Sequence, residues 1–166
     1  TFYLKDATEG FNMDEKDSAS LYGTFIALVF FTPFLGGLIA DRYLGYRRSI
    51  ILGGLLMGVG YCTMGIHSET MLYVSMTLVI IGNGFFKPNI SCLVGTMYSE
   101  NDPRRASGFS IFYMGINIGA MIAPVITQIL AQRYFGTTDT PAYKVVFITA
   151  GIGMIISLFW FWMGRS

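Results

Sequence analysis

The 166-residue chain is 53% apolar and 13% charged, which is about half the charged share of an ordinary soluble domain. Its formal net charge is +1, and no basic stripe runs along it, so the sequence gives no support for a nucleic-acid partner. Both cysteines, Cys62 and Cys92, lie within apolar runs, and we expect two small buried side chains and no disulfide. The composition is that of a membrane protein.

Five long stretches with almost no charge predict membrane-spanning helices. A bilayer core of about 30 Å requires roughly 20 helical residues, and each stretch is close to that length or above it. We therefore predict an all-α membrane protein, with helices at about 18–40, 49–66, 70–99, 103–132 and 141–164.

Boundary residues support two of these helix starts. Asp102 is a suitable N-cap with Pro103 at the first helical position, and Thr140 with Pro141 repeats the arrangement. The polar residues 5–17 are expected to form a surface loop.

The basic residues are unevenly distributed between the gaps. Arginines concentrate in the short gaps 41–48 and 99–105, and the positive-inside rule places such loops in the cytoplasm. The first stretch would then begin outside the cytoplasm. A further helix upstream would bring the start of the chain back inside, so we expect the chain to be a fragment of a longer protein.

The first predicted helix, 18–40, carries Tyr22 near its outer end. On position alone this tyrosine is expected to anchor the helix at the membrane interface. Pro33 lies inside the same helix, and Pro88 and Pro124 lie inside two others. Each proline removes a backbone donor and frees the carbonyl four residues earlier.

The second predicted helix, 49–66, is rich in glycine. In lipid, small residues let helix backbones approach closely, so this helix is expected to pack tightly against its neighbours. The glycines concerned are Gly53, Gly54, Gly58 and Gly60.

Lys87, in the third predicted helix, is the only one of eleven basic residues that lies inside an apolar run and not in its first few residues. A cation at that depth costs about 2.5–3.5 kcal/mol on insertion scales, and snorkelling recovers only roughly 6 Å. Asn83 and Ser91 lie four residues to either side and complete a polar stripe. Because no acidic residue occurs in the five runs, we expect Lys87 to meet a substrate carboxylate or an acid elsewhere in the protein, rather than to hold helices together.

The fourth predicted helix carries a second polar stripe, formed by Ser110, Tyr113 and Asn117. For Asn117 an interhelical hydrogen bond is as well supported as ligand binding. Gly115 and Gly119, in the same helix, are expected to form a contact face.

The segment GGLIADRYLGYRR, residues 36–48, resembles the G-x-x-x-D-[RK]-x-x-G-[RK]-[RK] loop of the major facilitator superfamily. Its glycine, Gly37, would allow close helix approach, and Asp41 would end a helix beside several arginines. We expect charge pairs there to hold one cytoplasmic arrangement of helices and to release it in another. Ordinary positive-inside topology explains the arginines but not the spaced glycine and aspartate. The arginines are Arg42, Arg47 and Arg48.

Longer motifs are similar to those of the proton-dependent oligopeptide transporter family within that superfamily. They are GNGFFKPNIS (82–91) and FSIFYMGINIGAM (109–121), with SLYGTF (20–25) and DPRRASGFS (102–110) in the same order. The resemblance implies the major facilitator fold, in which the five helices are the second to sixth of an N-terminal six-helix bundle. The first helix and the C-terminal bundle would then lie outside this sequence.

The same resemblance implies roles for individual residues. Lys87 would take part in proton coupling and meet the carboxylate end of a peptide, while Asn117 and Tyr22 would contact the peptide. No metal and no cofactor is implied, and protons are the coupling ion. Secondary candidates are Asn83, Ser91 and Tyr113.

The implied function is a proton-coupled symporter that imports di- and tripeptides by alternating access across a bacterial-type cytoplasmic membrane. Its partners would be small peptides, protons, the lipid bilayer and the C-terminal half of the same protein. A facilitator-type carrier of nitrate or a drug-like anion keeps the fold and changes the cargo. A membrane-embedded enzyme would need a nucleophile–base pair or metal ligands at depth, and the five runs contain no His, Asp or Glu. A non-transporting scaffold would leave Lys87 unexplained.

Overall fold

The computed structural model describes residues 2–5, 11, 13–136 and 142–164. The described chain is almost entirely helical, which confirms the all-α prediction. The helices are α1 (Phe2–Lys5), α2 (Glu15–Ile39), α3 (Tyr46–Met64), α4 (Glu69–Thr96), α5 (Arg104–Ile129) and α6 (Tyr143–Met163). The predicted cap at Thr140 and Pro141 lies outside the described residues.

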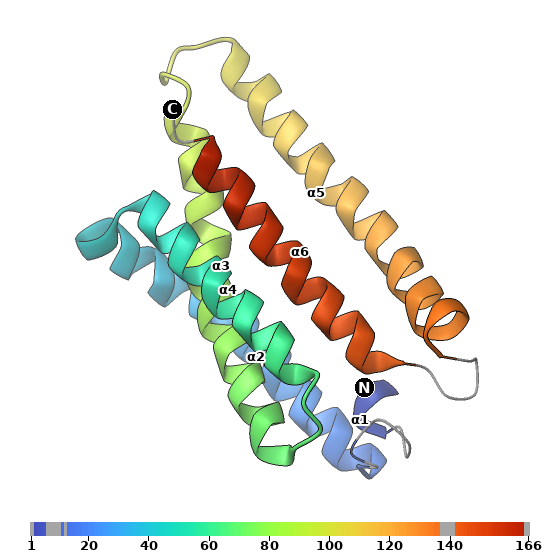
Figure 1. The fold of residues 1–166 in the computed structure, drawn as a ribbon. Helices are drawn as coiled ribbons and strands as arrows, with labels where there is room; N and C mark the ends of the chain where they lie inside the picture. Colours follow the sequence, from blue (N-terminus) through green and yellow to red (C-terminus); the bar gives the residue numbers. More distant parts are fainter. Residues whose placement is uncertain (1, 6–10, 12, 137–141, 165–166) are drawn as a thin grey trace.

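The five long helices run alongside one another, and successive helices point in opposite directions (Figure 1). The contacts place α3 and α4 together at the centre, with α2 against α4 and α6 against α3. Helix α5 stands apart and has no buried residue. It meets α4 near the end that the two helices share, where a Cβ added to Gly108 would collide with the Tyr98 ring.

Four helices are long and apolar enough to cross a membrane: α2 and α5 with their terminal turns, α4, and α6. Helix α3 does not meet these criteria although it has 19 residues, about 28 Å at 1.5 Å per residue. Its glycines and its two arginines at the start make it less apolar than its neighbours. A membrane span at 49–66, as predicted from the sequence, therefore depends on the packing of α3 against α4 and α6.

Glycine pairs set the close approach of the central helices. A Cβ on Gly36 of α2 would overlap the carbonyl oxygen of Gly84 in α4, and a Cβ on Gly53 of α3 would crowd the carbonyl oxygen of Gly82. The carbonyl that Pro88 frees is that of Gly84, so it faces the backbone of α2. These contacts confirm the expected packing role of the glycines in α3.

The close approach of α2 is not made by Gly37, the glycine singled out from the sequence motif. A Cβ there would lie 3.8 Å from the Cβ of Pro88, which is an ordinary van der Waals contact. Gly36 is the position without room, so that part of the prediction is wrong by one residue. For Gly115 and Gly119 no described atom lies within 4 Å of an added Cβ, and their contact role stays a prediction.

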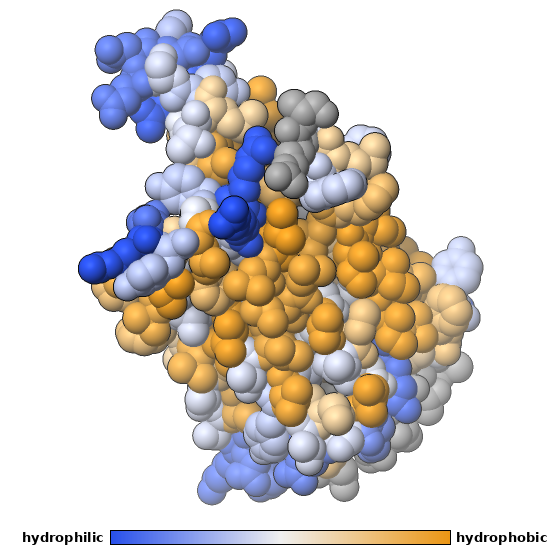
Figure 2. Space-filling model, turned by 60° about the vertical axis from the view of Figure 1, so that its left-hand side comes forward, coloured by the Kyte–Doolittle hydropathy of each residue, from blue (hydrophilic) through white to orange (hydrophobic). Residues whose placement is uncertain are grey.

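The two ends of the molecule differ in chemistry. One end, called the arginine end here, holds the α2–α3 turn, the α4–α5 loop and the last turn of α6; side chains from the start of α3, from the α4–α5 loop and from the last turn of α6 line pockets there. At the opposite end Leu4 of α1 packs against Leu72 of α4 in a small hydrophobic core. Between the two ends, Figure 2 shows a continuous hydrophobic surface.

Helices α2 and α5 end in the same way. Each has a proline in its last two turns, Pro33 or Pro124, and each continues into a π-helical turn, Ala40–Leu44 or Leu130–Tyr134. The two π-helical turns lie at opposite ends of the molecule. This repeated pattern is what an inverted repeat of three-helix units would produce, because α5 follows α2 after an interval of three helices.

One prediction about the cysteines is wrong. Both thiols are free, but only Cys62 is partly buried, whereas Cys92 is exposed. The side chain of Cys92 lies on the face of α4 that lines a pocket with Tyr46 and Arg105.

Candidate functional site

Lys87 lies in α4, nine residues before the end of the helix at Thr96, which corresponds to about 14 Å along the axis. Its ammonium nitrogen is 5.1 Å from the centroid of the Phe30 ring on α2. Among the described residues no carboxylate forms an ion pair with it. The structure thus places an uncompensated cation on an exposed face of α4, well away from either helix end.

The contact with Phe30 is too weak to account for this cation. An exposed cation–π contact contributes about 0.5–1 kcal/mol, and the Phe30 side chain is 69% exposed. The insertion cost of a lysine at depth is about 2.5–3.5 kcal/mol. The ring orients the ammonium group but leaves most of this cost without a compensating partner. The sequence alone offers no signal that would single out Phe30 among the aromatic residues of α2.

The three side chains of the polar stripe around Lys87 lie in different environments. The Asn83 amide donates a hydrogen bond of 3.0 Å to the carbonyl of Val29 in α2, so this side chain joins two helices. Ser91 lies towards the arginine end, in a pocket of about 600 Å³ that Tyr46 and Arg105 also line. Lys87 is the member of the stripe that remains exposed without a polar partner among the described residues.

Asn89, which the sequence reasoning passed over, is the most buried polar side chain near the lysine, at 1% exposed. Its amide nitrogen donates to the carbonyl of Phe85 at 2.7 Å, while its side-chain oxygen has no partner among the described residues. The sequence signal that could have identified Asn89 is its position as a polar residue directly after Pro88 in an apolar run.

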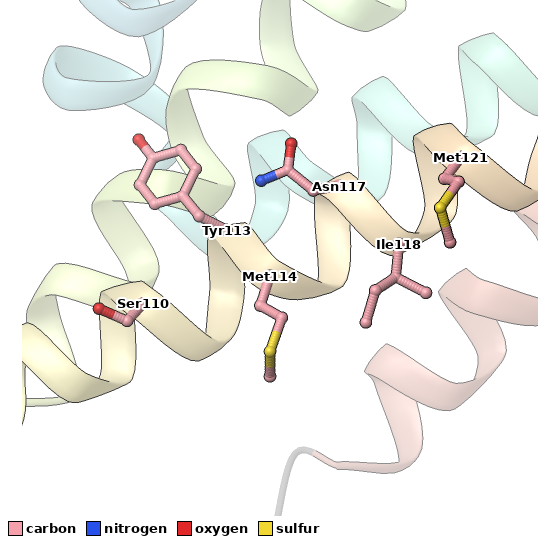
Figure 3. A pocket seen from close by; sticks show the side chains of 6 residues that line it. All are labelled: Ser110, Tyr113, Met114, Asn117, Ile118 and Met121. Atoms are coloured by element: carbon pink, nitrogen blue, oxygen red, sulfur yellow. The ribbon is translucent and has the colours of Figure 1, made fainter.

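The polar stripe on α5 faces open space. Figure 3 shows Tyr113 and Asn117 projecting from one side of the helix, and Met114 and Ile118 from the other. The surface depression here is about 510 Å³ and is lined by residues of α5 alone, Ser110 among them. Its polar side chains are therefore accessible, with no described neighbour opposite them.

The three main candidates lie on three helices. Asn117 is thirteen residues from the start of α5 and Tyr22 seventeen residues from the end of α2. Counted from the start of α5 and from the end of α2, these positions correspond to about 20 Å and 26 Å along the respective axes, against about 14 Å for Lys87 from the end of α4. All three side chains are exposed. No described hydrogen bond or ion pair joins them. The described residues contain no group of three metal-ligating side chains.

At the arginine end Asp41 pairs with a tyrosine rather than with an arginine. The Tyr46 hydroxyl donates a hydrogen bond to the Asp41 carboxylate, and the negative charge of Asp41 raises the pKa of this hydroxyl. Arg42 lies over the ring of the neighbouring Tyr43, with 5.8 Å between its guanidinium carbon and the ring centroid. The predicted charge pairs between Asp41 and the arginines are absent from the described contacts.

Comparison with known proteins identifies the family. The model of the POT family (PTR2) matches residues 47–166. The chain is 40% identical over 157 residues to a di-/tripeptide transporter of Lactococcus lactis subsp. lactis (strain IL1403), covering 94% of this chain and 30% of that protein. It is 35% identical over 165 residues to the uncharacterized transporter YclF of Bacillus subtilis (strain 168), covering 99% of this chain and 32% of that protein.

The fold agrees with the sequence matches. It superposes with a TM-score of 0.90 and 36% identity on the crystal structure of a mutant peptide transporter POT in complex with alafosfalin, covering 99% of this chain and 33% of that one. The chain thus spans about a third of the length of the curated relatives it matches. Since the family model matches most of the sequence and the relatives align along nearly all of it, the chain belongs to the POT family.

Proposed function

We propose that the protein is a proton-coupled symporter that imports di- and tripeptides across the cytoplasmic membrane by alternating access, with α2–α6 as part of its N-terminal bundle. The observation that carries this proposal is the uncompensated ammonium group of Lys87. It is a carboxylate-binding group within an apolar helix of a chain whose relatives include a di-/tripeptide transporter.

The candidate side chains lie on three helices, as a site that contacts several groups of one short peptide would require. Lys87 is on α4, Asn117 on α5 and Tyr22 on α2. An extended dipeptide spans about 7 Å and a tripeptide about 10 Å. A peptide whose carboxylate meets Lys87 would direct its other polar groups towards the Asn117 amide and the Tyr22 hydroxyl, with Tyr113, Asn83 and Ser91 as secondary contacts.

Proton coupling would act through the same ammonium group. A carboxylate from another part of the full-length protein would pair with Lys87 when it is ionised and release it when it is protonated. The released lysine would then bind the peptide carboxylate. In this scheme the charge of Lys87 stays constant. The protonation state of the other carboxylate determines whether Lys87 pairs with that carboxylate or with the carboxylate of the peptide.

The α2–α3 turn is the proposed gate at the cytoplasmic side. The hydrogen bond between Asp41 and Tyr46 closes the π-helical turn at the end of α2. Rocking of the bundle would move this turn against the rest of the protein. The residues assigned to this role are Gly37, Asp41, Arg42, Arg47 and Arg48.

The test is uptake of dialanine by proteoliposomes that contain the full-length protein. An inward pH gradient should drive accumulation by the wild type, and Lys87→Ala should abolish this accumulation, because no other described cation lies at that depth. Lys16→Ala, which removes an exposed lysine in the first turn of α2, is the matched control and should leave uptake unchanged. Gradient-driven uptake that survives Lys87→Ala would show that the assigned role of Lys87 is wrong.

The same ammonium group favours one other class of cargo. An uncompensated cation binds nitrate or a drug-like anion as readily as a carboxylate, because the Coulomb attraction does not depend on the rest of the solute. Competition separates the two cases. Excess unlabelled dipeptide should suppress dialanine uptake while nitrate does not, and suppression by nitrate alone would favour the anion carrier.

A further inference from the structure

Two unpaired arginines line a pocket at the arginine end, on the side of the molecule formed by α3, α4 and α6. Arg47 and Arg48 lie in the first turn of α3, and Trp160 and Trp162 lie in the last turn of α6; together they border a pocket of about 640 Å³. None of the nine described lining residues is acidic. Within the described part of the chain neither guanidinium forms an ion pair. The pocket therefore offers two free cations.

An apolar groove continues from this pocket towards the middle of the helices. It has a volume of about 220 Å³, shares Trp160 and Phe161 with the arginine pocket, and is lined almost wholly by apolar side chains, among them Ile90 and Met154. Met154 lies ten residues before Gly164, about 15 Å along the α6 axis. The groove thus leads from the arginine end towards the hydrophobic surface that lies between the two ends of the molecule (Figure 2).

The two tryptophans indicate the level of the membrane surface. Trp160 is 76% exposed and Trp162 is exposed as well, in a helix that is otherwise strongly apolar. Tryptophan is enriched where acyl chains meet headgroups. The arginines consequently lie at headgroup level and the groove at acyl-chain level.

From this arrangement we propose that the arginine pocket and the apolar groove together bind one anionic phospholipid of the cytoplasmic leaflet. Arg47 and Arg48 would hold its phosphate by charge-assisted hydrogen bonds, Trp160 and Trp162 would flank the headgroup, and an acyl chain would occupy the groove beside Met154. Basic pockets between helices at the cytoplasmic side bind anionic headgroups in this way. The site is separate from the exposed lysine of α4.

The experiment measures phospholipid retained by the purified full-length protein, using native mass spectrometry together with thermal unfolding. Phosphatidylglycerol and phosphatidylcholine with identical acyl chains are added separately, and glycerol phosphate is added as a headgroup without chains. Phosphatidylglycerol should be retained and should raise the unfolding temperature, whereas phosphatidylcholine and glycerol phosphate should do neither. Removing one arginine should weaken retention about fivefold, in Arg47→Gln and Arg48→Gln alike.

Matched variants and salt distinguish this site from general lipid adhesion. Arg104→Gln removes an arginine at the same end that is already paired with Asp102, and it should retain phosphatidylglycerol as the wild type does. Trp160→Ala should reduce retention without affecting the helix core, since this side chain is largely exposed. In the wild type, retention should fall as ionic strength rises.

Three results would overturn the proposal. The first is equal retention of phosphatidylglycerol and phosphatidylcholine, and the second is full retention by the arginine variants. The third is the absence of any retained phospholipid in the wild type, as would follow if another segment of the protein fills the pocket. These outcomes do not bear on peptide uptake, because retention is measured without substrate or pH gradient.

Discussion

At the scale of single residues, the energetics of Lys87 decide whether its charge is available to a ligand. Among the described residues the strongest contact of its ammonium group is the ring of Phe30, at 5.1 Å, and such contacts are worth less than the cost of placing a lysine at depth. The neighbouring Asn83 is already committed to the carbonyl of Val29. Lys87 is therefore poised to gain from any carboxylate that reaches it.

Asp102 gives a residue-scale prediction that depends on pH. Its carboxylate accepts hydrogen bonds from the side chain and from the backbone N–H of Arg104, and the side-chain bond is the larger cause of its lowered pKa. The ionised form is thus favoured in the folded protein. Its stabilising effect is fully present above the unfolded-state pKa of about 3.9, and it is lost as the pH falls through the lowered folded-state value.

We expect Asp102→Asn to lower the unfolding temperature of the full-length protein slightly at pH 7, because the charged pair with Arg104 is lost while the amide oxygen can still cap the helix. The difference from the wild type should shrink below about pH 4. Thermal unfolding in detergent between pH 7 and pH 3 measures this. A difference that persists unchanged at pH 3 would contradict the assigned role of the carboxylate.

At the scale of helices, the seam between α2 and α4 depends on one glycine of a neighbouring pair. A Cβ on Gly36 would overlap the Gly84 carbonyl oxygen, whereas a Cβ on Gly37 would meet Pro88 at 3.8 Å. Gly36→Ala must push the two backbones apart, and overpacking of this kind costs about 1–3 kcal/mol. Gly37→Ala should remain within about 0.5 kcal/mol of the wild type.

Thermal unfolding of the two variants, side by side in the same detergent, checks this prediction. Gly36→Ala should unfold several degrees below Gly37→Ala. Equal unfolding temperatures would mean that α2 and α4 do not approach at Gly36 as the structure shows.

The helices themselves could be predicted from the sequence because their signals are local. Long uncharged runs and the Asp102 cap mark most of the boundaries, and the Asp102 oxygen does accept the Arg104 N–H at 2.8 Å. Contacts between helices could not be predicted in the same way. Whether Gly36 or Gly37 meets α4, and whether Asp41 pairs with Tyr46 or an arginine, depends on rotations of the helices that no single run of residues encodes.

At the scale of the whole molecule, the candidate site consists of side chains on three different helices. No described hydrogen bond or ion pair joins these side chains to one another. Motif resemblance could nominate Tyr22, Lys87 and Asn117, and the family to which they pointed is confirmed by the match over residues 47–166. Their roles remain a proposal, because a binding site requires facing surfaces. Helix α5 has no buried residue, and no described residue of another helix lines the depression at Asn117.

Orientation in the membrane is the whole-molecule property that the proposed import and the proposed lipid site both require. Arginines gather at the end that holds the α2–α3 turn and the α4–α5 loop, and the positive-inside rule places this end in the cytoplasm. Single cysteines can test this after Cys62 and Cys92 are replaced by alanine. Ser99→Cys lies in the α4–α5 loop and Thr70→Cys in the first turn of α4, and both positions are exposed.

A membrane-impermeant maleimide should label Thr70→Cys in right-side-out vesicles and Ser99→Cys in inside-out vesicles, because successive helices alternate in direction. The reverse pattern would put the arginine pocket in the outer leaflet and the proposed gate on the wrong side. Labelling of both positions in one vesicle type would instead mean that α4 does not cross the membrane, although its 28 residues reach about 42 Å, more than the thickness of the hydrocarbon core.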